Sequence, residues 1–335
     1  MQHKFYPKIV LLPVVLAALL ATACQRTGTS DHSSGSVSRT GFFFDTVVSL
    51  TVNGTDDDSV LDECFTLMEN YEAMLSRTRE NSDVWKINHS SGKPVTVSDE
   101  TASLLSLAMK YSELSDGAFD ITIAPYVELW DFKENPGTVP SEADLAEAGS
   151  HVGISSLRLD GNTVTLDDPE AAVDLGAIAK GYIADRVKEF LTSQGVESAL
   201  INLGGNVLTI GNRSSSSPWN IGIRDPLGDS DDIITSIRIS GKSVVTSGTY
   251  ERYFEKDGVR YHHILDPKTG LPVQNGLESV TILSNSSAEG DALSTSCFVL
   301  GLEKGMELVE SLDGTEALFI TDEQELCCSD GFPKE

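Results

Sequence analysis

Segments with strand-like and helix-like residue patterns follow one another irregularly along this chain, and that order limits the folds open to it. Apolar residues at helical spacing mark residues 58–76 and 178–191, whereas an Asp-Gly pair between two alternating runs marks a hairpin at residues 157–166. A doubly wound parallel sheet needs strands and helices in regular alternation, which this sequence lacks. We therefore predict an α+β fold.

The expected elements cover the chain from residue 41 onward, and no repeat or clear linker divides them. A single domain at residues 41–335 is therefore expected. Strands are expected at residues 42–52, 157–159, 164–166, 199–203, 207–210, 219–223, 233–239, 244–246 and 317–320. Helices are expected at residues 58–76, around 104–111, after Ser141, and at 178–191, 291–299 and 304–312.

The first 23 residues have the pattern of a secretion signal. Lys4 and Lys8 precede an apolar run at residues 9–20, which is short for a membrane span of ~20 residues but typical of a signal peptide. Cys24 follows small residues, as in bacterial lipoproteins, where this thiol takes a diacylglycerol. We expect a lipoprotein signal that ends before a lipidated Cys24; an ordinary cleavage site before a chance cysteine is the alternative.

The segment after this cysteine and the charge balance bear on location and partners. Residues 24–40 are polar, Ser-rich and without periodicity, which is typical of a flexible tether. The chain has 51 acidic and 24 basic residues, a formal net charge of −27, and loss of the two lysines in the signal makes it −29. Such a charge disfavours nucleic acid and the bare surface of anionic lipid as partners. We expect an extracytoplasmic protein held at the cell membrane by its lipid anchor.

The other four cysteines show no metal-binding spacing. Cys64 and Cys297 lie in apolar contexts and are expected to be buried. Cys327 and Cys328 are adjacent near the C-terminus, where a disulfide stays open. No cysteine is expected to be catalytic.

Two segments join turns to regular structure and carry candidate ligand groups. Residues 116–122 form an Asp-Gly turn into an alternating run that places Asp120 and Thr122 on one side of a strand; taken alone, a structural role explains this best. Residues 174–181 open a helix with small residues and carry Lys180. Because amides at a helix start can bind an anion, an anionic ligand is as good an explanation of this lysine as a solvated surface position.

A third segment pairs a carboxylate with a hydroxyl one helical turn later, at Asp291 and Thr295. Two such oxygens suit Mg²⁺, although an acidic residue in a first helical turn is the simpler explanation of this segment alone. Residues 246–252 and 261–270 contain polar turns, and His263, read alone, is a strand histidine.

Taken together, these segments resemble the ApbE family of FAD:protein FMN transferases, also called flavin transferases, which are typically bacterial lipoproteins. The resemblance covers roughly residues 41–320. It implies a single compact ApbE-like α+β domain with mixed or antiparallel sheets and packed helices. The motifs that carry it are, in order, residues 44–46, 75–77, 116–122, 174–181, 246–252, 263–270 and 291–295.

The resemblance also implies an activity and partners. Members of the family use Mg²⁺ to cleave FAD, attach the FMN half through a phosphoester to a Thr or Ser of a partner protein, and release AMP. The implied acceptor is a flavin-carrying subunit of a membrane redox complex, of Rnf or Nqr type or similar, with an Asp-Gly-x-Thr type of acceptor sequence.

The same resemblance implies roles for individual residues. Mg²⁺ would be held by the carbonyl of Ala177 with Asp291 and Thr295. His263 is expected as the base, because its unperturbed pKa lies near neutrality, and Asp291 is the second candidate. The FAD site would be lined by Phe44, Thr78, Ala118, Phe119, Asp120, Asp174, Lys180, Ser247 and Leu265; Phe44 and Thr78 stand where many members have Met and Tyr.

Two alternatives stay open. The first is an FAD pyrophosphatase, in which water replaces the acceptor hydroxyl in the same site. The second is a lipid-anchored flavin-binding or solute-binding protein without catalysis, although such binders usually show two α/β lobes. Turnover of FAD with and without an acceptor protein separates these classes.

Overall fold

A computed structural model describes residues 35–134, 136–229 and 231–333, and it confirms the α+β prediction. These described residues group into one compact unit. Its centre is an eight-stranded sheet in which all neighbouring strands run antiparallel, in the order β1-β2-β6-β7-β10-β13-β14-β15. These strands are β1 (Ser36–Phe43), β2 (Thr46–Asn53), β6 (Ala199–Leu203), β7 (Asn206–Ile210), β10 (Ser243–Gly248), β13 (Leu277–Ser284), β14 (Glu316–Thr321) and β15 (Leu326–Cys328).

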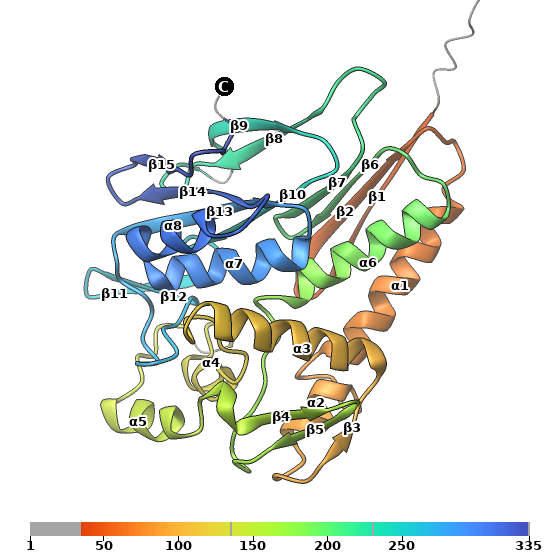
Figure 1. The fold of residues 1–335 in the computed structure, drawn as a ribbon. Coiled ribbons are helices and arrows are strands. Elements are labelled where there is room, and N and C mark those ends of the chain that lie inside the picture. Colours follow the sequence, from red (N-terminus) through yellow and green to blue (C-terminus); the bar gives the residue numbers. More distant parts are fainter. Residues whose placement is uncertain (1–34, 135, 230, 334–335) are drawn as a thin grey trace, which may run out of the picture. The chain divides into compact units, whose positions relative to one another are not determined.

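Helices cover one face of this sheet, as Figure 1 shows. The helices are α1 (Ser59–Leu75), α2 (Asp83–Asn88), α3 (Asp99–Leu114), α4 (Ala124–Trp130), α5 (Glu142–Ser150), α6 (Ala179–Ser193), α7 (Ser287–Leu300) and α8 (Leu302–Glu310), with a 3-10 turn at Ile154–Ser156. Of these, α6 packs against β6 and β7, α7 against β10 and β13, and α8 against β14.

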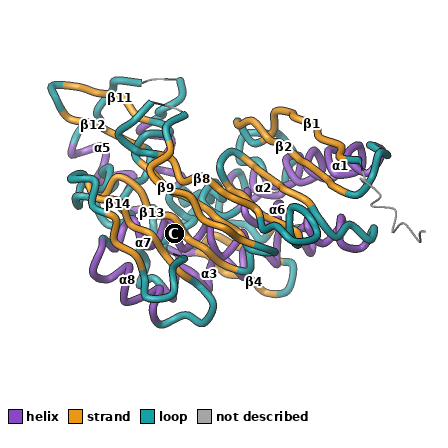
Figure 2. Tube along the Cα trace, turned by 90° about the horizontal axis from the view of Figure 1, so that it is seen from above, coloured by secondary structure: helices purple, strands orange, loops and turns teal. Residues whose placement is uncertain are grey.

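The opposite face of the sheet is covered by a separate hairpin of β8 (Trp219–Arg224) and β9 (Ile233–Ile239). Alternation along the strands explains this arrangement, since successive side chains point to opposite faces. Val244 and Leu283 pack with the hairpin, whereas Ile282 is buried on the side of the helices and the buried Val245 lies against Gly290 of α7. Figure 2, viewed from above, shows the strands lying over the helices.

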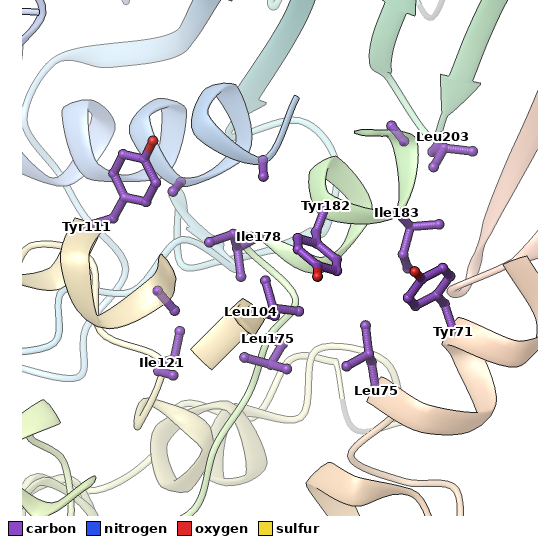
Figure 3. Packing of buried hydrophobic residues seen from close by; sticks show 14 of the residues in the cluster. Tyr71, Leu75, Leu104, Tyr111, Ile121, Leu175, Ile178, Tyr182, Ile183 and Leu203 are labelled. Carbon is purple, nitrogen blue, oxygen red and sulfur yellow. The ribbon is translucent and has the colours of Figure 1, made fainter. Parts of the chain in front are cut away.

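A second layer of helices and small sheets continues the core beyond α6 and α7. It contains a three-stranded sheet of β3 (Val95–Thr96), β5 (Thr163–Leu166) and β4 (Leu157–Asp160), and a hairpin of β11 (Tyr253–Lys256) and β12 (Val259–His262). Figure 3 shows Leu104 of α3 near Ile178 and Tyr182, which lie at the start of α6, and Tyr111 of α3 pointing toward α7. One apolar core therefore holds the two layers together.

The first strand differs from the prediction. The run expected as one strand at residues 42–52 is a hairpin of β1 and β2, in which Phe44 and Asp45 form the turn with φ of 54° and 57°. β1 begins at Ser36, so the expected tether at residues 24–40 is wrong for residues 36–40, which pair with β2. The predicted signal peptide at residues 1–23 and Cys24 lie outside the described residues.

Most other predicted elements are confirmed. The elements that the sequence did not predict are short, or are strands buried on both faces. The expected strand after Asp116-Gly117 is wrong, because residues 118–122 form a loop that leads into α4. α2 and α4 have six and seven residues, too few to show helical periodicity. β13 is buried on both faces and therefore lacks alternation. Cys64 and Cys297 are buried as predicted, and Cys327 and Cys328 lie in β15.

Every helix within the described part of the chain is too short or too polar to traverse a lipid bilayer.

Candidate functional site

The predicted site centres on the contact between the start of α6 and the first two turns of α7. Asp185 of α6 caps the N-terminus of α7: its Oδ1 accepts from the Ser287 N–H at 2.8 Å, and its Oδ2 accepts from the Ala288 N–H at 3.0 Å. In return, Asp291 of α7 accepts the Gly181 N–H at its Oδ2 at 2.9 Å. These reciprocal hydrogen bonds fix the position of Asp291 against the start of α6.

Asp291 is a buried carboxylate, only 4 % exposed. Among the described residues, no Lys, Arg or His side chain forms an ion pair with it. A buried charge without a counter-charge is costly, and a bound cation removes that cost. The environment of Asp291 therefore suits a cation ligand.

The neighbours of Asp291 provide further oxygen atoms. Thr295 lies one turn later on α7 and is half-buried, and its Oγ1 is 3.3 Å from the Ser247 Oγ of β10. Ser247 also lies 2.8 Å from the Ser294 Oγ. Ala177 belongs to the turn that leads into α6, four residues before Gly181. Carboxylate, hydroxyl and carbonyl oxygens are the donors that Mg²⁺ prefers, so these residues fit that ion.

The loop before α6 is anchored by Asp174. Its Oδ1 accepts from the Gly176 N–H at 2.7 Å, and its Oδ2 forms an ion pair with the Arg77 Nε at 2.8 Å. Lys180 then donates from its Nζ to the Gly176 carbonyl at 3.2 Å, which keeps the ammonium group at the start of the helix. Asp174 therefore holds the loop in place, while Lys180 supplies a positive charge there.

His263 follows β12, and its backbone N–H donates to the Arg252 carbonyl at 3.0 Å. The Nδ1 atom of its ring is buried and has no hydrogen-bond partner within the described structure. Burial, reinforced by the nearby charges of Arg252 and Lys180, lowers the pKa of His263 to about 3. The imidazole is therefore neutral at physiological pH, and it lies close to two cationic side chains.

Other predicted FAD-site residues have clear structural roles. Both oxygens of Asp120 are engaged, since Oδ1 accepts from the backbone and hydroxyl of Thr122, at 2.8 and 2.6 Å, and Oδ2 accepts from the Ile154 N–H at 2.8 Å. Ala118, Phe119 and Leu265 are buried in the apolar core. Their predicted contact with FAD stays a prediction.

The remaining two predicted FAD-site residues lie nearer the surface. Phe44 is half-buried in the turn between β1 and β2, where its N–H donates to the Glu72 Oε1 at 2.7 Å. Thr78 is exposed on the loop after α1. An aromatic ring and a hydroxyl are thus available at these positions, and their predicted contact with the flavin stays a prediction.

Sequence reasoning assigned no role to Glu251, which the fold places near Asp291 and Lys180. Its side chain keeps contact with solvent, yet desolvation by the surrounding protein raises the pKa of its carboxyl, as does the charge of Asp291. The turn between β6 and β7 approaches the same residue at Gly205. The Gly204-Gly205 pair in the sequence was the available signal for a close approach of this backbone.

The fold and site define a class: an α+β protein in which a buried oxygen-donor cluster lies beside Lys180, Arg252 and a neutral histidine. Cationic side chains beside a group of oxygen donors suit a phosphate-containing ligand with its counter-ion. The ApbE family model matches residues 44–319, and this chain belongs to the ApbE family.

Relatives and solved structures support the same assignment. A protein of Klebsiella pneumoniae named FAD:protein FMN transferase is 44% identical and is matched over 82% of this chain and 85% of its own length. A Treponema pallidum protein of the same name is 39% identical over 82% of this chain and 80% of its own. The ApbE protein of Thermotoga maritima has a similar structure, with a TM-score of 0.83 at 36% identity, covering 89% of this chain and 98% of that one.

Proposed function

We propose that this protein is an FAD:protein FMN transferase, which moves FMN from FAD to a Thr or Ser hydroxyl of a partner protein and releases AMP with the help of Mg²⁺. The observation that carries the proposal is the buried Asp291 carboxylate, which has no basic partner in the described structure and lies one turn from Thr295. The names of the relatives give the reaction class.

In this proposal Mg²⁺ is held by the Asp291 carboxylate, the Thr295 hydroxyl and the Ala177 carbonyl. When bound, the ion neutralises phosphate charge and polarises the phosphoryl oxygens. Gly181 keeps one Asp291 oxygen occupied at 2.9 Å, which orients the other oxygen of the carboxylate.

Lys180 supplies positive charge for the diphosphate of FAD. The protein has a net charge of −27, so its overall field repels this substrate and the attraction has to be local. The hydrogen bond from the Lys180 Nζ to Gly176 restricts the ammonium group to the helix start, so less side-chain freedom is lost when a phosphate binds.

The chemical step exchanges one phosphorus–oxygen bond for another. The acceptor hydroxyl oxygen attacks the phosphorus of the FMN half, the bond to the bridging oxygen breaks, and AMP leaves. The hydroxyl proton passes to a ring nitrogen of His263, which is neutral and therefore able to accept it. A bound diphosphate offsets the charges of Lys180 and Arg252, which raises the pKa of His263 from its low value and makes it a better base.

The proposed location follows from the N-terminal sequence. A lipidated Cys24 would anchor the enzyme outside the cytoplasm, ahead of β1, which begins at Ser36. Tethering raises the effective concentration of enzyme toward acceptors at the same membrane. Flavin-carrying subunits of membrane redox complexes are the proposed acceptors.

Mass spectrometry of a Thr-bearing acceptor after incubation with the enzyme, FAD and Mg²⁺ tests the proposal. The expected result is an acceptor heavier by the FMN moiety, together with stoichiometric AMP. AMP release at the same rate without any acceptor, and no labelled product, points instead to an FAD pyrophosphatase. Binding of FAD without AMP release points to a non-catalytic flavin-binding protein.

A further inference from the structure

A second cluster of ionisable side chains, which shares no residue with the site above, surrounds His151 at the end of α5. Its Nδ1 is 2.7 Å from the Asp168 Oδ2. Its Nε2 is 3.4 Å from the Glu170 Oε2 and 3.8 Å from the Glu147 Oε1. The ligand atoms of Glu147, His151 and Glu170 all lie within 4.8 Å of one another.

The geometry fixes the tautomer of this histidine. The Asp168 carboxylate can only accept a hydrogen bond from Nδ1, and its position is set by a second hydrogen bond, from the Glu170 N–H to Oδ1 at 2.9 Å. In the neutral ring, Nε2 then carries the lone pair, and the nearest ionisable groups to it are the carboxylates of the two glutamates. This atom is buried and has no hydrogen-bond partner in the described structure. A metal-binding imidazole usually donates its other ring N–H to a carboxylate or carbonyl, as His151 does to Asp168.

The two distances from Nε2 are close to those between ligands of one metal ion. Two ligands bound tetrahedrally to Zn²⁺, at about 2.0–2.1 Å each, lie about 3.3 Å apart, close to the 3.4 and 3.8 Å measured from Nε2. The Glu147 and Glu170 side chains are 81% and 70% exposed, so both can adjust and an ion can reach them. His151 is the most buried of the three, with 18% of its side chain exposed.

We propose that Glu147, His151 and Glu170 bind a divalent transition-metal ion of the Zn²⁺ type, with Asp168 orienting the imidazole and water completing the coordination. An imidazole nitrogen favours such an ion over Mg²⁺. Charge favours the ion as well. Without it, the carboxylates of Glu147, Asp168 and Glu170 around a protonated histidine leave a net charge of two negative units. With a divalent ion and a neutral histidine, the net charge is one negative unit.

The site would have a structural effect on the chain. A metal ion there would join the C-terminal end of α5 to the segment 167–172. Ala172, at the end of this segment, forms a parallel bridge with Ile123, and Asp174 of the proposed FAD site follows two residues later. Sequence spacing hides this site, because Glu147 and His151 are one helical turn apart but Asp168 and Glu170 follow about twenty residues later. Its existence does not depend on the proposed transferase activity.

Zn²⁺ binding to the full, metal-stripped chain tests the proposal. Calorimetric titration at pH 8, with excess Mg²⁺ present to fill the site at Asp291, is expected to show one Zn²⁺ per chain, and His151→Gln is expected to weaken binding at least tenfold. His89→Gln is the matched control, since His89 is an exposed histidine whose Nδ1 contacts the Trp85 carbonyl and which has no acidic partner among the described ion pairs. Asp291→Asn, made in parallel, is expected to keep the Zn²⁺ site.

Two further measurements separate this site from other Zn²⁺ ligands. Co²⁺ bound at the cluster is expected to lack thiolate charge-transfer absorption, which excludes Cys327 and Cys328 as ligands. In ¹⁵N NMR spectra of the histidine side chains, Zn²⁺ is expected to shift the Nε2 resonance of His151 and to leave Nδ1 protonated. Equal Zn²⁺ affinity in wild type and His151→Gln, or a His151 that stays protonated at both nitrogens with Zn²⁺ present at pH 8, would overturn the proposal.

Discussion

Gly181 and Ser287 approach so closely that a Cβ on Gly181 would lie 2.2 Å from the Ser287 carbonyl oxygen. This contact allows the start of α6 to lie against the start of α7, and the Gly181 N–H then reaches the Asp291 carboxylate. A small residue in one helix therefore sets the position of the proposed metal ligand in another.

Gly181→Ala is expected to push α6 and α7 apart. Overpacking of this kind costs about 1–3 kcal/mol of folding free energy, and the hydrogen bond to Asp291 is lost with it. The free energy of unfolding, measured with urea, and the rate of FAD turnover are both expected to decrease. An unchanged free energy of unfolding with full turnover would mean that the two helices can separate without disturbing Asp291.

Asp291→Asn is expected to lower the Mg²⁺-dependent turnover rate by about 10²-fold or more, because a charged metal ligand is lost. The amide oxygen of the new side chain can still accept the hydrogen bond from the Gly181 N–H, so the fold is expected to be retained. Thr295→Val is expected to have a milder effect. Initial rates across a Mg²⁺ series measure both, and Asp313→Asn, an exposed aspartate, is the control. Wild-type rates for Asp291→Asn at ordinary Mg²⁺ would place the metal elsewhere.

His263→Gln is expected to lower the transfer rate by about 10²- to 10⁴-fold, the usual effect of losing an acid–base group, with FAD affinity largely retained. Single-turnover rates and equilibrium FAD binding separate the two quantities. A large loss of affinity with a normal rate at saturating FAD would instead make His263 a binding residue.

The low pKa of His263 also predicts a pH dependence of stability. Between about pH 6.5 and 3 the unfolded chain binds a proton at this position that the folded chain does not, so this group's contribution to stability is present above pH 6.5 and is lost as the pH falls. Lowering the pH from 7.5 to 5 is therefore expected to destabilise wild type more than His263→Gln, by on the order of 1 kcal/mol. Urea unfolding at the two pH values measures the difference; equal losses would contradict the lowered pKa.

Lys180→Met is expected to raise the Kd for FAD about tenfold, because it removes a charge that attracts the diphosphate both before and during reaction. Lys188→Met is a matched control on the same helix, since the Lys188 Nζ also donates to a backbone carbonyl, at 3.3 Å. Fluorescence titration of FAD measures both. Similar Kd values for the two variants would leave Lys180 as a surface lysine.

Cys24→Ser is expected to block lipidation and release the protein from the membrane fraction, since it removes the thiol that takes the lipid. Fractionation of cells and the mass of the mature N-terminus measure the outcome. A variant that is processed and fractionated like wild type would show that residues 1–23 are an ordinary signal peptide.

Local sequence determined much of the secondary structure. α1 and α6 follow the spacing of their apolar residues, and α5 begins where the Ser141 Oγ accepts from the Asp144 N–H. These elements depend on contacts between residues three or four positions apart, which a sequence displays directly. The motifs likewise indicated the ApbE family, because their residues and their order along the chain can be recognised in the sequence without knowing how the chain packs.

The tertiary structure alone decided the state of the site. Asp291 is buried and bound to Gly181 because α6 and α7 pack closely, and Asp174 faces Arg77 because the loop before α6 lies beside the end of α1. The pKa of His263 depends on burial and on charges from other segments of the chain. His151 contacts Asp168 and Glu170 because the β4–β5 hairpin between them brings the chain back to the end of α5. Burial and charge proximity are properties of residues far apart in sequence, so they emerge only when the whole core has packed.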